Sequence, residues 1–174
     1  DSFSHDLQWT QAREMLARLE VFARDRGRRF GVKLTNTLAS ANNREELPGG
    51  EMYMSGRSLY PITTTVASLI SSEFKGRMPI SYSGGVTIHT AAGLLATGIR
   101  PLTLCTDMLK PGGYRRQKQI AEALEKAPGW NLNTIDVAGL GSLAEKSLSE
   151  KSSLKSFRGD DAVRNAGALP AGDW

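Results

Sequence analysis

A short apolar stretch that leads into paired glycines constrains the fold of this chain more than any other feature. Met78–Tyr82 is typical of a buried strand, Gly84 and Gly85 end it, and a helix-like segment follows. Further along, residues 100–107 form a second strand-like run that ends in small polar residues. Successive strand–loop–helix units predict a parallel sheet with right-handed crossovers.

The remaining elements extend this alternation in both directions. Helices are predicted at residues 7–26, from Pro61 to Gly76, at 88–97 and at 114–126, and strands at residues 29–36, 78–82 and 101–105. Residues 38–52 are polar, and we predict a long loop there. A complete eight-stranded α/β barrel needs at least about 200 residues, so 174 residues supply at most about half of one. The chain is therefore either part of a barrel completed elsewhere in a longer polypeptide or a small open α/β sheet.

Composition divides the chain into two regions. After Pro128 and Gly129 the sequence becomes rich in Ser, Lys, Ala and Gly. We predict part of a barrel over residues 1–128, followed by a C-terminal helical extension and linker over residues 129–174. The first residue is Asp1 rather than Met, which we interpret as the start of a fragment or of a processed chain.

Composition also narrows the class of protein. Cys105 is the single cysteine, which allows no internal disulfide and no zinc or iron–sulfur site within the chain, and two distant histidines give no metal site. No membrane span or secretory signal is visible, and we expect a reducing, cytoplasmic location. The net charge is only +4. We interpret the basic clusters at residues 24–29 and 114–118 as solvated helix ends rather than a nucleic-acid surface.

The glycines at the strand ends suggest a binding site for a phosphate. Glycine lets main-chain N–H groups approach an anion closely, and the following helix directs its positive end toward it. In α/β barrels the loops after the last two strands commonly bind phosphate. Taken alone, each glycine pair is equally compatible with a tight turn.

Several sequence runs resemble one family of flavin enzymes. The runs cover residues 31–38, 51–61, 79–85, 98–103 and 106–114, and include Gly-Val-Lys-Leu-Thr-Asn-Thr-Leu, Pro-Ile-Ser-Tyr-Ser-Gly-Gly and Thr-Asp-Met-Leu-Lys-Pro-Gly-Gly-Tyr. They are similar to the bacterial selenate reductase flavoprotein subunits, relatives of dihydropyrimidine and dihydroorotate dehydrogenases. The resemblance implies an α/β fold that is the C-terminal half of a TIM (β/α)8 barrel. It implies FMN in this region and a small unsaturated substrate. FAD, NADPH and iron–sulfur clusters would belong to the rest of a larger parent polypeptide or to other redox subunits.

The resemblance also implies roles for individual residues. Lys33 matches a lysine that stabilises negative charge on the reduced flavin ring, and Thr35 and Asn36 would face the ring or a flat substrate. The remaining positions match loops around the ribityl chain and phosphate: Ser55, Gly56, Ser83, Gly84, Gly85, Cys105 and Thr106. From the residues alone, Lys33 could equally be a solvated lysine at a strand edge, and Asn36 could cap a turn.

Two positions complicate this interpretation. Asp107 follows the proposed phosphate loop, where a carboxylate repels an anion unless it points away. Cys105 is expected to pack in the interior rather than act as a nucleophile. No catalytic acid or base is identified. Two alternatives therefore stay open: a degenerate barrel with a scaffolding role in a redox complex, or a barrel that binds a phosphorylated metabolite, with Lys33 as a Schiff-base lysine.

Overall fold

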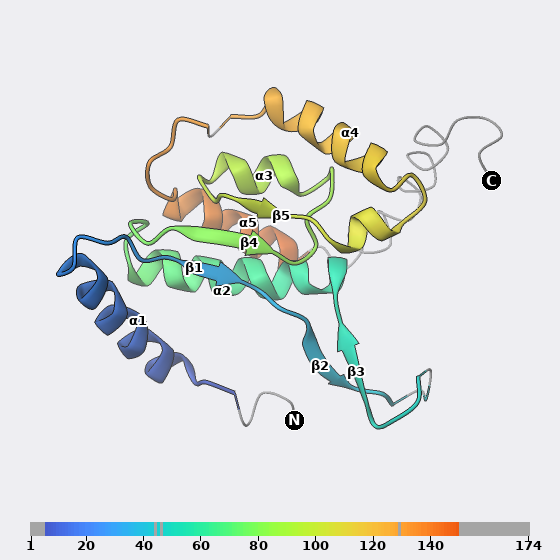
Figure 1. Cartoon of the computed structure of the whole chain (residues 1–174), viewed down its shortest axis with the longest axis horizontal. Coiled ribbons are helices and arrows are strands. Elements are labelled where there is room, and N and C mark those ends of the chain that lie inside the picture. Colours follow the sequence, from blue (N-terminus) through green and yellow to red (C-terminus); the bar gives the residue numbers. More distant parts are fainter. Residues whose placement is uncertain (1–5, 44, 46, 129, 150–174) are drawn as a thin grey trace.

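Helices and strands alternate along most of the chain (Figure 1). The structure is a computed structural model that describes residues 6–43, 45, 47–128 and 130–149. In chain order the elements are α1 (Trp9–Arg24), β1 (Val32–Leu34), β2 (Leu38–Ala41), β3 (Glu51–Met54), the 3₁₀ helix η1 (Gly56–Leu59), α2 (Tyr60–Glu73), β4 (Ile80–Ser83), α3 (Ala91–Ala96), β5 (Leu102–Thr103), the 3₁₀ helix η2 (Thr106–Leu109), α4 (Tyr114–Glu125) and α5 (Val137–Ser149).

The central sheet is parallel and follows the order β1-β4-β5. Lys33 pairs with Ser81 between β1 and β4, and Ser83 pairs with Thr103 between β4 and β5. Strands that are neighbours in space are thus also successive strands of the sheet in the chain, with α2 and α3 as crossovers. This is the connectivity of strand–helix units in an α/β barrel, and it confirms the predicted parallel α/β arrangement.

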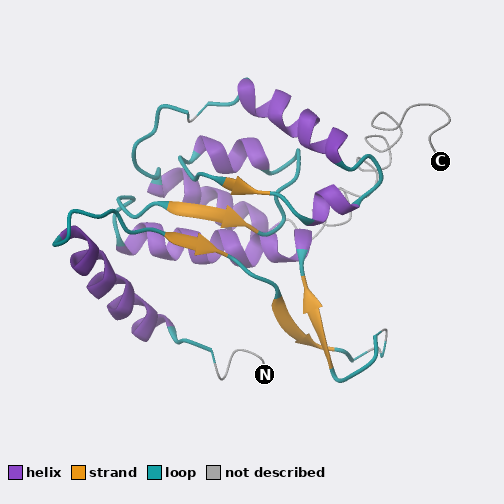
Figure 2. Cartoon of the chain, viewed as in Figure 1, coloured by secondary structure: helices purple, strands orange, loops and turns teal. Residues whose placement is uncertain are grey.

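The two faces of this sheet have opposite character. Alternate residues of β4, Ile80 and Tyr82, are buried in a core to which α2, α3, α4 and α5 all contribute (Figure 2). Between them, Ser81 and Ser83 point to the other face and are only half-buried, while Lys33 on β1 is exposed. Because side chains alternate across a strand, the sheet has one apolar face covered by helices and one polar face that the described helices leave open.

Helix α5 packs against α2 and belongs to the same core. Leu140 and Ala144 are buried, and the hydroxyls of Thr64 and Ser147 lie 3.0 Å apart across the helix pair. The segment before α5 is also fixed, because the Ile135 amide donates to the Gly76 carbonyl at 2.9 Å. This helix lies inside the region 129–174 that the sequence assigned to a C-terminal extension, and residues 150–174 of that region lie outside the described residues.

Residues 38–52 do not form the loop that their composition predicted. Strands β2 and β3 pair as an antiparallel hairpin that projects from the end of the sheet (Figure 1). The buried Asn42 closes its long turn, because the side-chain amide donates to the carbonyls of Leu47 and Gly49 and the backbone amide donates to Gly50 at 3.0 Å. The polar residues of this segment therefore satisfy the backbone of a turn between two strands.

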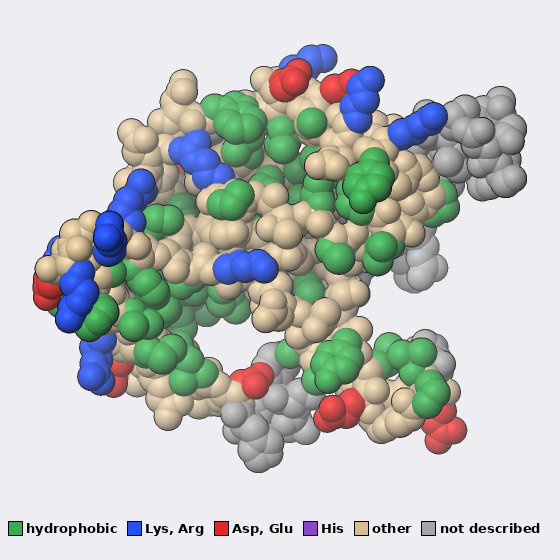
Figure 3. All heavy atoms as spheres, viewed as in Figure 1, with side chains coloured by type: hydrophobic (Ala, Val, Ile, Leu, Met, Phe, Trp, Pro, Cys, Tyr) green, Lys and Arg blue, Asp and Glu red, His purple; other side chains and the backbone are tan. Residues whose placement is uncertain are grey.

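Helix α1 lies beside the sheet rather than in its core. Leu16 and Ala17 contact the core cluster. The Arg77 guanidinium donates two hydrogen bonds, of 2.9 and 2.8 Å, to the carboxylate of Glu20. The predicted apolar stripe is present, yet Leu19 and Phe22 on it remain exposed. A hollow separates this helix from the hairpin in the space-filling view (Figure 3). Among the described residues, no helix combines the length and the apolar character that crossing a membrane requires.

Candidate functional site

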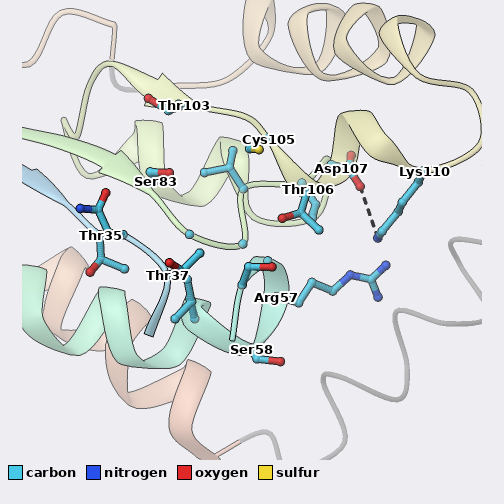
Figure 4. A pocket seen from close by; sticks show the side chains of 18 residues that line it. Thr35, Thr37, Arg57, Ser58, Ser83, Thr103, Cys105, Thr106, Asp107 and Lys110 are labelled. Atoms are coloured by element: carbon cyan, nitrogen blue, oxygen red, sulfur yellow. Dashed lines mark ion pairs between the residues drawn. The ribbon is translucent and has the colours of Figure 1, made fainter. Parts of the chain in front are cut away.

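A cavity of about 590 Å³ lies where the three parallel strands end (Figure 4). Its walls are the segment after β1, the start of η1, the loop after β4, and the segment from β5 into η2. In α/β proteins, ligands bind outside the carboxyl ends of parallel strands. The position of the cavity therefore agrees with that of an active or binding site.

The structure brings together nine of the ten residues that the sequence predicted for a cofactor site. The nine that line the cavity are Thr35, Asn36, Ser55, Gly56, Ser83, Gly84, Gly85, Cys105 and Thr106. They come from four segments that are far apart in the chain. Lys33 does not line the cavity; it is exposed on β1, two residues before Thr35. Lys33 therefore lies close in the chain to the part of the cavity wall that follows β1.

Close packing explains why glycine occupies the loop after β4. Gly84 and Gly85 have φ angles of +119° and +73°, which side-chain-bearing residues rarely adopt. A Cβ on Gly85 would lie 2.8 Å from the Cβ of Tyr60. None of the described residues accepts a hydrogen bond from the amides of Gly84 or Gly85. The loop thus packs tightly on η1 and α2 while it keeps two main-chain donors beside the cavity.

A threonine fixes the shape of this loop. The hydroxyl of Thr90 accepts a hydrogen bond from the amide of Thr87 at 2.9 Å and donates one to the carbonyl of Gly85 at 2.9 Å. Thr90 is itself buried. The carbonyl of Gly85 is therefore already hydrogen-bonded within the protein.

Asp107 does not oppose an anion in the way that its sequence position suggested. Its carboxylate is buried and lies 3.2 Å from the guanidinium Nη1 of Arg116 and 3.4 Å from the Nζ of Lys110. The Arg116 Nε donates to the Pro111 carbonyl at 2.7 Å. Two cations therefore offset the negative charge of Asp107.

Sequence reasoning missed the two basic residues that line the cavity. Arg57 and Lys110 lie at its far end from Thr35 (Figure 4). Burial lowers the pKa of the Lys110 ammonium, and the nearby positive charge of Arg57 lowers it further, against the opposing effect of Asp107. In the sequence, only their positions could have indicated a role at the site: Arg57 directly follows Ser55 and Gly56, and Lys110 precedes a Pro-Gly-Gly turn.

The lowered pKa of Lys110 gives a testable pH dependence of stability. Its folded-state pKa lies below the ordinary 10.5, so between these two values the unfolded chain binds more protons than the folded one. The free energy of unfolding of the wild type should therefore rise, relative to that of Lys110→Met, as the pH increases through this alkaline window. Urea denaturation of both proteins at neutral pH and near pH 10 measures the difference. For Lys118→Met, an exposed control on α4, the difference from wild type should stay constant.

Cys105 lines the cavity as an exposed thiol, so the prediction that it packs in the interior is wrong. It lies between β5 and η2, directly before the first residue of η2. The described part of the chain contains no group of three or more His, Cys, Asp or Glu residues placed to hold a metal ion. A ligand in this cavity would therefore be held by main-chain amides, hydroxyls and basic side chains.

Comparisons with known proteins point to one family. Residues 1–155 match the family model described as "Oxidoreductase YgfK, N-terminal TIM-barrel domain". Two relatives, from Escherichia coli strain K12 and from Escherichia coli O157:H7, are both named "Putative oxidoreductase YgfK". Each is 46% identical to this chain over 173 residues, which cover 99% of the chain and 17% of the relative. No solved structure matches the chain. The family match and the parallel strands together confirm the prediction of part of a TIM barrel.

Proposed function

The chain belongs to the family of oxidoreductase YgfK N-terminal TIM-barrel domains, and from that premise we propose that it binds the phosphate end of FMN in a flavin-dependent oxidoreductase. One observation carries the proposal: the predicted loop residues from four separate segments converge on a single cavity at the strand ends. The parent protein would relay electrons from NADPH through FAD and iron–sulfur modules outside this chain to a small unsaturated substrate. We also propose that the chain is related to the selenate reductase flavoprotein subunits and to dihydropyrimidine dehydrogenase.

The residues present fit a phosphate group. Gly84 and Gly85 line the cavity, and their main-chain amides have no acceptor among the described residues, so they can act as donors. Ser55 and Thr106 bring hydroxyl groups, and Arg57 brings a guanidinium that can bind phosphate through two parallel hydrogen bonds. Donors of these types, held rigidly by the fold, bind an anion without reorganising.

The open face of the sheet fits the rest of the proposed ligand. Lys33, Ser81 and Ser83 present polar side chains on the side of the sheet that none of the described helices covers. When bound, FMN would supply hydride or electron transfer. The role of Lys33 would be to place a positive charge beside the ring, and that of Thr35 and Asn36 would be to orient it.

The proposal predicts that the purified chain quenches the fluorescence of FMN on titration. Thr106→Glu would place a carboxylate among the phosphate donors and should weaken the affinity for FMN by at least about 10-fold, which corresponds to about 1.4 kcal/mol. Ser142→Glu, on the exposed side of α5, should bind like the wild type. If FMN leaves the fluorescence unchanged at every concentration, the flavin proposal fails and the scaffolding alternative gains support.

A further inference from the structure

We infer that Lys110 and Arg57 form a cation pair that selects a phosphate monoester in its dianionic form, and that the buried pair of Asp107 and Arg116 holds Lys110 in place for this task. The inference rests on the proposed function and deepens it. It concerns the end of the cavity formed by η1 and by the segment from η2 to α4. The inference is independent of the glycine loops, because main-chain amides there would bind any oxyanion and would not select a dianion.

The first step is the rigidity of the buried pair. The side chain of Arg116 is 0% exposed and that of Asp107 is 1% exposed, with 3.2 Å between Nη1 and Oδ1. Arg116 also donates to the Pro111 carbonyl at 2.7 Å. One guanidinium thus fixes both the carboxylate in η2 and the turn that follows it. The segment that carries Lys110 lies between these two attachment points.

The second step is the position of Lys110. Its Nζ lies 3.4 Å from the same Oδ1 atom of Asp107, and its side chain is 27% exposed and lines the cavity. Arg57 reaches the same end of the cavity from η1 (Figure 4). Two basic side chains from different segments therefore lie at the same end of the cavity, and one of them is paired with Asp107.

The third step is charge. Arg57, Lys110 and Arg116 carry three positive charges and Asp107 carries one negative charge, so the four side chains together carry a net charge of +2. A phosphate monoester carries about −1.5 to −2 at pH 7, because its second pKa is about 6. A phosphodiester has one ionisable oxygen and carries a single charge. A terminal phosphate monoester therefore matches this group of charges better than a phosphodiester or an uncharged hydroxyl group.

The pKa of Lys110 agrees with this arrangement. Burial lowers it, and Arg57 and Arg116 lower it further, so protonated Lys110 is held at a cost that an anion would offset. Binding of a dianion should raise the pKa of Lys110 back toward its ordinary value. Because binding and protonation are linked, the affinity for the dianion should fall at alkaline pH as Lys110 loses its proton.

The experiment titrates the whole chain with FMN and with riboflavin, which lacks the phosphate, between pH 5 and pH 8. The affinity of the wild type for FMN should rise as the phosphate loses its second proton near pH 6, and the affinity for riboflavin should stay flat. Lys110→Met should lose most of this rise and bind FMN about 10-fold more weakly at pH 7.5, because a charge-assisted hydrogen bond is lost. Lys118→Met removes the same charge outside the cavity and should behave like the wild type.

A second measurement tests the positioning role of Asp107. Nuclear magnetic resonance of labelled lysine follows the Lys110 pKa with and without inorganic phosphate. Phosphate should raise this pKa in the wild type, and Asp107→Asn should lower it, since the carboxylate favours the charged ammonium. A purely structural role for Asp107 would leave the Lys110 pKa unchanged. If Asp107→Asn does not fold, the Lys110→Met titration still decides the inference.

The outcomes separate the inference from the proposed function. If Lys110→Met and the wild type bind FMN with the same affinity and pH profile, the cation pair is overturned while FMN binding stands. If inorganic phosphate raises the Lys110 pKa but FMN does not bind, the flavin proposal fails and the cation pair stands. If neither ligand has an effect, both are wrong.

Discussion

Replacing Arg116 with methionine should lower the free energy of unfolding by about 3 kcal/mol or more. The substitution keeps an unbranched side chain in place of the aliphatic part of arginine, but it removes the guanidinium that neutralises Asp107, whose side chain is 1% exposed. It also leaves the Pro111 carbonyl without the donor that lies 2.7 Å away. Urea denaturation followed by circular dichroism measures the loss.

A double variant identifies the cause. Arg116→Met combined with Asp107→Asn removes both buried charges, so it should be more stable than Arg116→Met alone, because an uncompensated buried charge costs more than a missing pair. Equal stability of the single and double variants would show that the loss comes from packing rather than from the charge on Asp107. The exposed variant Lys118→Met should differ from the wild type by less than about 0.5 kcal/mol.

The second large effect concerns α5. Leu140→Ala should cost about 2–5 kcal/mol, since it leaves a cavity at a side chain that is 0% exposed between α5 and the core. Leu148 lies on the same helix and is 60% exposed, so Leu148→Ala serves as the matched control and should change stability by less than about 0.5 kcal/mol.

The measurement is the urea midpoint of each variant, converted with a common slope. Near-equal losses at the two leucines would mean that α5 does not pack as described. A large loss at Leu140 alone would show that the folded core extends past residue 128, into the region that composition had set apart as an extension.

The sequence predicted those elements that are specified by residues close together in the chain, such as α2 and β4. The stripe of apolar residues in α2, the proline at its start and Gly76 after its end specify that helix within a few residues. The strand that became β4 ends in Gly84 and Gly85, and both the turn and its position at the cavity followed from the glycines.

The predictions failed where a residue has more than one possible structural role, or where its role depends on residues that are distant in the sequence. Residues 38–52 are polar because Asn42 and its neighbours satisfy a turn, and polarity alone does not distinguish a loop from a hairpin turn. The role of Asp107 depends on Arg116, nine residues later, which becomes its neighbour only once η2 and α4 are folded. Arg57 lies far from Lys110 in sequence, so only the tertiary structure could show that both line the same cavity.

The uncovered side of the sheet has a consequence for the electrostatics of Lys33. Water now reaches this lysine and screens its charge, and an exposed charge acts weakly over distance. A surrounding wall of further strands would turn the same surface into a lumen of low dielectric constant, where one ammonium group exerts a far stronger field. If a redox group binds there as proposed, the influence of Lys33 on it would therefore depend on closure of the barrel as well as on the distance between them.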